Sequence, residues 1–232
     1  MNLFSKMALC FGLSVSLQAA PFLVEGFADL DNLPGWVIAN NSTPGGATPE
    51  GWFQGTGVFP AQAGSPDSYA QANFENAGDP GDISTWLLTP VLTLRPQSVL
   101  RFWTIGEDVP GFPDRLEVRL STSGASTNVG STPFSAGDFT TLLLSINPAL
   151  DDAGYPTVWT EYSYAFSALS SPVEGRVGFR YFVPDNTVSG STIGLDSVSI
   201  VPEPASGILL SAGLGFFFVL RNRRKQKREE SL

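Results

Sequence analysis

Residues 176–183 read Arg176-Val177-Gly178-Phe179-Arg180-Tyr181-Phe182-Val183. Every second position of this stretch carries a large apolar side chain: Val177, Phe179, Tyr181 and Val183. A period of two is typical of a β-strand with one face in the core, whereas a helix repeats its apolar positions every three to four residues. The stretch therefore predicts a β-strand that buries one face.

The same pattern continues on both sides of this stretch. Alternating or apolar runs, separated by turns rich in Gly, Pro, Asn, Asp and Ser, occupy residues 22–27, 36–39, 68–74, 85–94, 99–105, 115–121, 140–146, 160–166 and 192–201. No stretch of the body shows a helical stripe, and nothing repeats at a fixed period. These features predict one all-β domain over residues 20–200, built as an antiparallel β-sandwich or jelly roll.

A different composition begins at residue 201. Val201-Pro202-Glu203-Pro204 is followed by an uncharged apolar run over 205–220 and then by a basic cluster: Arg221, Arg223, Arg224, Lys225, Lys227 and Arg228. As a helix, the apolar run would rise about 24 Å, against a hydrocarbon core of about 30 Å. We expect a single short C-terminal transmembrane helix with its cations in the cytoplasm. A buried core helix is the alternative, and the cations that follow disfavour it.

The order of triplet, apolar run and basic end resembles the PEP-CTERM sorting signal. In this resemblance Val201, Pro202, Glu203 and Pro204 form the sorting motif, and the basic cluster stops transfer through the membrane. The resemblance implies a transient anchor in the inner membrane of a Gram-negative-type bacterium. An exosortase-type membrane peptidase would recognise it and release the body to the cell surface or extracellular matrix.

The N-terminus is typical of a secretory signal peptide. Lys6 precedes an apolar stretch over residues 7–17, and small residues follow at Ala19 and Ala20. We expect cleavage after Ala19, which gives a signal peptide over residues 1–19. Cys10, the chain's one cysteine, would leave with it, so the exported protein is expected to have neither a disulfide nor a thiolate site.

The charge of the body excludes one class of partner. Residues 20–201 contain 19 acids against six arginines, a balance of −13, although the whole chain has a net charge of −9. No lysine occurs in this range. Such a surface repels phosphate backbones, so we expect no nucleic-acid binding.

The body resembles the choice-of-anchor J domain, which is related to cleaved-adhesin and MAM-like jelly-roll modules. The matching fragments are residues 25–27, 34–36, 85–90, 100–103, 114–118, 177–181 and 194–200. The resemblance implies a jelly roll and suggests a structural calcium ion where the first and last strands meet.

Two carboxylates are the candidate calcium ligands. Glu25 shares parity with Leu23 and Phe27, and Asp196 shares parity with Val198 and Ile200. If those apolar residues face the core, both acids point inward, where a Ca²⁺ ion could satisfy them. The alternative is that Asp196 caps a turn and that Glu25 pairs with an arginine such as Arg180.

The chemistry available for catalysis is limited. The chain has no histidine, which excludes Ser-His-Asp and Cys-His pairs and histidine-bound metals. Hydrolysis by a pair of carboxylates remains chemically possible. The candidate residues are Glu107, Asp108, Asp151, Asp152 and Glu161. Most of them lie beside Pro/Gly turns, where acids are common for turn chemistry alone. We therefore expect no enzyme.

Trp52 and Phe53 are candidate ligand-stacking residues, because they lie in the glycine-rich loop over residues 40–57. Packing in the core is the favoured alternative for Trp52.

Two functions follow from these features. The first is an exported, non-enzymatic surface or matrix protein associated with exopolysaccharide, biofilm or adhesion. The alternative is a secreted carbohydrate-binding module or a carbohydrate-active enzyme that uses paired carboxylates.

Overall fold

The computed structural model describes residues 22–202, which belong to one compact unit. The predicted signal peptide, the apolar run over 205–220, the basic cluster, Glu203 and Pro204 lie outside the described residues. No helix within residues 22–202 is long and apolar enough to cross a membrane.

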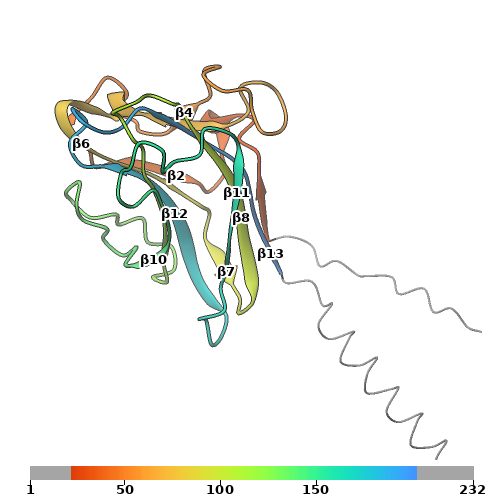
Figure 1. Ribbon diagram of the computed structural model, residues 1–232. Helices are drawn as coiled ribbons and strands as arrows, with labels where there is room; N and C mark the ends of the chain where they lie inside the picture. Colours follow the sequence, from red (N-terminus) through yellow and green to blue (C-terminus); the bar gives the residue numbers. More distant parts are fainter. Residues whose placement is uncertain (1–21, 203–232) are drawn as a thin grey trace, which may run out of the picture. The chain divides into compact units, whose positions relative to one another are not determined.

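The described chain folds into two antiparallel sheets (Figure 1). The first sheet has the order β11 (Thr160–Ala165), β8 (Ser98–Gly106), β13 (Thr192–Pro202), β5 (Ala70–Asn73) and β4 (Phe53–Gln54), with β1 (Leu23–Glu25) also paired to β13. The second has the order β10 (Thr141–Ile146), β9 (Leu116–Ser121), β12 (Val173–Val183), β6 (Ala77–Leu88) and β2 (Val37–Asn40); β3 (Thr43–Gly45) pairs with β6, and β7 (Leu92–Leu94) with β12.

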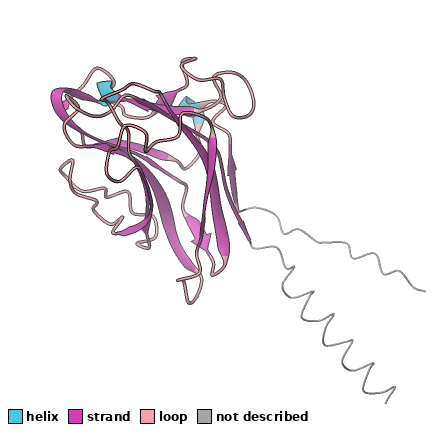
Figure 2. Cartoon of the chain, in the orientation of Figure 1, coloured by secondary structure: helices cyan, strands magenta, loops and turns pink. Residues whose placement is uncertain are grey.

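Helical structure in residues 22–202 consists of two short 3₁₀ turns, η1 (Leu30–Asn32) and η2 (Phe74–Asn76) (Figure 2). The predicted all-β antiparallel sandwich is confirmed.

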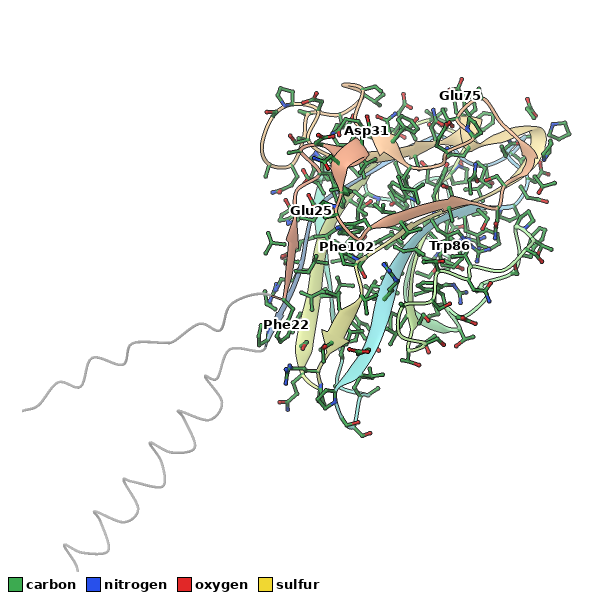
Figure 3. All side chains as sticks on the ribbon, turned by 180° about the vertical axis from the view of Figure 1, so that it is seen from behind. Phe22, Glu25, Asp31, Glu75, Trp86 and Phe102 are labelled. Atoms are coloured by element: carbon green, nitrogen blue, oxygen red, sulfur yellow. The ribbon has the colours of Figure 1, made fainter. Side chains whose placement is uncertain are left out.

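The core lies between the sheets and is built from the alternating positions of their central strands. The four apolar residues that define β12 in the sequence are completely buried. Phe179 of β12 meets Phe102 of β8 edge to face, with ring centroids 5.2 Å apart (Phe102 is labelled in Figure 3). The period-two pattern therefore identified the layer contact correctly.

The outer faces of both sheets are also covered by long connections. On the second sheet, Trp86 and Leu88 pack against Val129 and Phe139 of the β9–β10 connection. On the first sheet, Ile105 packs against Phe59 and Tyr69. This second layer of burial explains why Arg180, on the outer face of β12, is 1% exposed.

The largest differences from the sequence prediction concern three strands. The segment 40–57, predicted to be a loop, contains β3 and β4, and β6 begins at Ala77 instead of residue 85. The turn-like composition of Gly78-Asp79-Pro80-Gly81 hides the start of β6 in the sequence.

The last strand contains an irregularity that reverses one prediction. Ser197 has φ 51°, and the register of β13 against β8 shifts between Asp196 and Ser199. The extra residue lets Leu195 and Val198 both face the core. Asp196 consequently does not share a face with Val198 and Ile200, and the prediction that it points into the core is wrong.

Strand β13 connects the two ends of the sandwich. It begins at Thr192, where Ile193 is opposite Gly106, and ends at Pro202, opposite Ser98. Val201 and Pro202 of the sorting motif are therefore the last residues of a paired strand. At about 3.3 Å per residue, the two ends of β13 are roughly 30 Å apart.

Candidate functional site

A pocket of about 320 Å³ lies at the end of the sandwich where β13 begins. Three connections line it: η2 with the start of β6, the β8–β9 connection, and the β12–β13 connection. They contribute Phe74, Asp79, Glu107, Phe112, Asn186 and Ser191. In Figure 3, Glu75, the neighbour of Phe74, lies far from Phe22, which marks the sorting-motif end. The volume falls at the lower end of the range of small-ligand sites, about 300–1,000 Å³.

Two phenylalanine rings form the apolar part of the pocket. Phe74 is 48% exposed and Phe112 is 38% exposed. Exposed apolar side chains that line a concavity are the kind of surface that ligand-binding grooves present. The pair thus offers flat apolar faces on which a ring-shaped ligand can lie.

The polar part of the pocket has free acceptors. Glu107 Oε2 accepts a hydrogen bond of 3.1 Å from Ser191 Oγ. Within residues 22–202, no hydrogen bond reaches Glu107 Oε1 or the Asp79 carboxylate. Asn186 is committed to the fold, because its Oδ1 accepts from Gly81 N and its Nδ2 donates to Gly78 O.

A buried carboxyl group lies next to Ser191 of the pocket lining. Asp114 is 2% exposed, and its Oδ1 accepts hydrogen bonds from Ser191 N (2.8 Å) and Tyr181 Oη (2.7 Å). Burial raises the pKa of Asp114 to about 6, against the opposing effect of these two donors. A perturbed carboxyl beside a pocket is typical of functional sites.

The pH dependence of stability has a definite sign at Asp114. Its pKa is about 6 in the folded protein against 3.8 ordinarily, so the stability that Asp114 contributes falls as pH rises from about 4 to about 6. Asp114→Asn keeps an acceptor for Tyr181 and Ser191 without the buried charge. We expect this variant to be more stable at pH 8, by up to about 3 kcal/mol, and little changed at pH 4. Urea unfolding at both pH values measures the difference, and equal effects at the two pH values would contradict it; Asp31→Asn, at an exposed site, is the control.

Several of the sequence's carboxylate candidates gather near Asp114. Glu107, Asp108 and Asp152 line a second cavity with Asp114, of about 10 Å³, which is room for roughly one water. Glu161 lies elsewhere, on the exposed face of β11, 3.5 Å from Arg101.

The two predicted calcium ligands have other partners. Glu25 Oε1 accepts from Gly26 N and Phe27 N. Asp196 Oδ2 accepts from Gln62 N and Ala63 N, so this carboxylate anchors the loop that covers the outer face of the first sheet. Burial raises the pKa of Asp196.

No group of three or more candidate ligands for a metal occurs within residues 22–202. The calcium ion stays a prediction. Glu25 keeps its predicted face, opposite Val198, but Asp196 lies on the other face of the sheet, so the two carboxylates do not converge. The alternative for Glu25 is also wrong, because none of the ion pairs within residues 22–202 involves Glu25, and Arg180 pairs with Glu117.

The structure corrects the prediction of a stacking role for Trp52. Its side chain is 1% exposed in the main core, and Nε1 donates to Thr85 O at 3.4 Å. The favoured packing alternative is confirmed, and Phe53 is half-buried in β4. The exposed aromatics that line the pocket are instead Phe74 and Phe112, which the sequence analysis missed. Gly111-Phe112-Pro113, an aromatic residue inside a turn, was the available signal.

Comparison with known proteins bears on the tail and the body separately. Residues 201–225 match the sequence profile of the PEP-CTERM protein-sorting motif. The comparison with curated protein sequences gives no match. The chain therefore carries the sorting signal that its C-terminus resembles, and this signal marks an exported protein that an exosortase processes and that Gram-negative bacteria sort to the cell surface.

The body is similar in fold to solved adhesin domains. One is the K1 cleaved adhesin domain of Lys-gingipain from Porphyromonas gingivalis W83: TM-score 0.54, 21% identity, covering 78% of this chain and 98% of that domain. Another is the K3 cleaved adhesin domain of the same protein: TM-score 0.51, 21% identity, covering 79% and 98%. At this identity the likeness shows a shared jelly-roll fold.

Proposed function

We propose that this protein is a non-enzymatic component of the cell surface or extracellular matrix that binds extracellular polysaccharide through the pocket at the end of its sandwich. Its C-terminal apolar segment anchors it transiently in the membrane, and an exosortase-type peptidase then releases the body. Association with exopolysaccharide would give it a role in biofilm structure or adhesion.

The observation that carries this proposal is the composition of the pocket. Phe74 and Phe112 offer open ring faces, and Glu107 and Asp79 offer unused acceptors beside them. A sugar ring has the matching chemistry, with apolar C–H faces and hydroxyl donors at its rim. The sorting signal supports the same ligand, since an exported protein meets polysaccharide at the cell surface.

The position of the pocket supports its use at a surface. It lies at the start of β13, whereas the sorting motif begins at the end of this strand. A body attached through residue 202 would thus carry the pocket on the end opposite to its attachment.

A second candidate function, glycoside hydrolysis, is favoured by one observation. Glu107 and Asp114 are neighbouring carboxyl groups, and the pKa of Asp114 is about 6, as a general acid would require. However, Asp114 is buried behind Ser191 and does not line the pocket. Sugar release that Glu107→Gln abolishes would favour the enzyme over the binding protein.

The test is binding of the exported protein to polysaccharide isolated from its native cells. We expect Phe112→Ala and Phe74→Ala each to weaken binding about tenfold or more, because each removes an apolar face worth about 1.5–3 kcal/mol. Phe134→Ala is the matched control, since Phe134 is 61% exposed and does not line the pocket. Equal binding by all three variants would refute a role for this pocket.

A further inference from the structure

We infer that the pocket selects sugar residues that carry a free amine over neutral and acidic sugars. This inference rests on the proposed function and specifies its ligand. It follows from which charges and hydrogen-bonding groups the pocket leaves unsatisfied.

The pocket offers acceptors and almost no donors. Glu107 Oε1 and both oxygens of Asp79 have no hydrogen-bond partner within residues 22–202. The one hydroxyl in the lining, that of Ser191, already donates to Glu107. The Asn186 amide is held by Gly78 and Gly81. Both carboxylates are exposed to water, so a ligand that displaces this water must bring donors. An ammonium group brings three donors together with a positive charge.

No cation lines the pocket. The arginines of residues 22–202 are placed elsewhere: Arg180 and Arg119 meet Glu117, Arg101 meets Glu161, Arg115 and Arg176 donate to backbone carbonyls, and Arg95 lies over Phe22. A carboxylate, sulfate or phosphate on a sugar would be repelled by Glu107 and Asp79, and the pocket lining has no cation to offset this repulsion. The −13 balance of the body adds repulsion at longer range, so acidic polysaccharide is disfavoured.

The phenylalanine rings favour the same ligand. A cation over the face of an aromatic ring is attracted by the ring's quadrupole. Phe74 and Phe112 are exposed beside the two carboxylates, so an ammonium group in this pocket can meet a ring face and a carboxylate together. A neutral sugar would gain the apolar contact but not the charge contacts.

Calorimetry with chemically matched oligosaccharides tests the inference. The exported protein is titrated with chitosan oligosaccharides, which carry free amines, with their fully N-acetylated counterparts, and with oligomers of a uronic acid. We expect the amine form to bind tightest and its advantage to shrink as salt is added. Glu107→Gln and Asp79→Asn should each reduce the advantage of the amine form over the acetylated form about twofold to fivefold, the range for one exposed ion pair. Glu50→Gln, an exposed acid outside the pocket, is the control and should change nothing.

The outcomes separate this inference from the function beneath it. Binding that Phe112→Ala weakens, but that is equal or tighter for the acetylated or acidic oligomers, overturns the amine preference and leaves polysaccharide binding standing. If no oligosaccharide and no native polysaccharide binds in a manner that depends on Phe112, both fail.

Discussion

Replacing Arg180 with methionine is expected to lower the free energy of unfolding by about 3 kcal/mol or more. Arg180 is 1% exposed and donates from Nη1 to Glu117 Oε2 at 3.0 Å, from Nε to Ser84 Oγ at 3.0 Å, and from Nη2 to Pro133 O. Methionine fills similar space but removes all three donors: Pro133 O loses its side-chain partner, and Glu117 and Ser84 keep only Arg119 Nε and Trp86 Nε1. Chemical denaturation of the exported protein measures the loss.

Arg180 and Glu117 both stay charged at neutral pH in this buried ion pair. Burial lowers the pKa of Arg180 to about 10, although Glu117 opposes this, so the guanidinium stays charged at neutral pH. Burial alone would raise the pKa of Glu117, but the hydrogen bond from Arg119 and the charge of Arg180 outweigh it and hold this pKa below its usual value. Glu117 therefore stabilises the fold at neutral pH, and this contribution is lost as the pH falls through its lowered pKa.

Arg101→Met provides the matched control for Arg180→Met. Arg101 pairs with Glu161 at 3.5 Å, with the two side chains 48% and 41% exposed. Pairs of this kind contribute about 0–1 kcal/mol. A loss at Arg180 no larger than the loss at Arg101 would show that the outer face of β12 is not sealed by the β9–β10 connection.

The second large effect is expected at the sorting motif. A chain with Glu203→Ala and Pro204→Ala should escape the exosortase and remain uncut, so the body should no longer be released. Immunoblotting of the membrane and exported fractions compares this variant with the parent chain. Gln226→Ala, a neutral change within the basic end, should be released normally, and normal release of the Glu203/Pro204 variant would contradict a role for the motif.

The fold was accessible from the sequence because its strands obey the rule of alternation. The alternation of Val177, Phe179 and Tyr181 predicts a strand with one face in the core, and all three side chains are buried in the structure. The tail was equally readable, since a triplet, an apolar run and a basic end are local features that need no tertiary contact to be recognised.

Assigning side chains to the two faces of a strand by alternate positions gave the wrong face for Asp196 in the last strand, because of one extra residue. Ser197 adopts φ 51° and adds a residue to β13, which moves Asp196 to the opposite face from the one that counting assigns. Nothing in Asp196-Ser197-Val198 distinguishes a bulge from a regular strand. The predicted orientation of Asp196 as a calcium ligand followed from that parity, whereas the parity assigned to Glu25 agrees with its register opposite Val198.

The pocket was inaccessible for a different reason. Phe74, Glu107 and Ser191 come from connections far apart in the chain, and only the pairing of β13 with both β5 and β8 brings them together. The buried contact of Tyr181 with Asp114 is likewise a tertiary event. Trp52 shows the converse: the glycine-rich loop made it a stacking candidate, but core packing was the favoured interpretation, and the structure buries its side chain.

The most direct test of export and processing is the mass and location of the polypeptide in its native cells. Fractionation followed by intact-mass spectrometry should find the body at the cell surface or in the medium, truncated near residues 201–204 and free of the basic end. Recovery of the uncut 232-residue chain, dissolved in the cytosol, would contradict it.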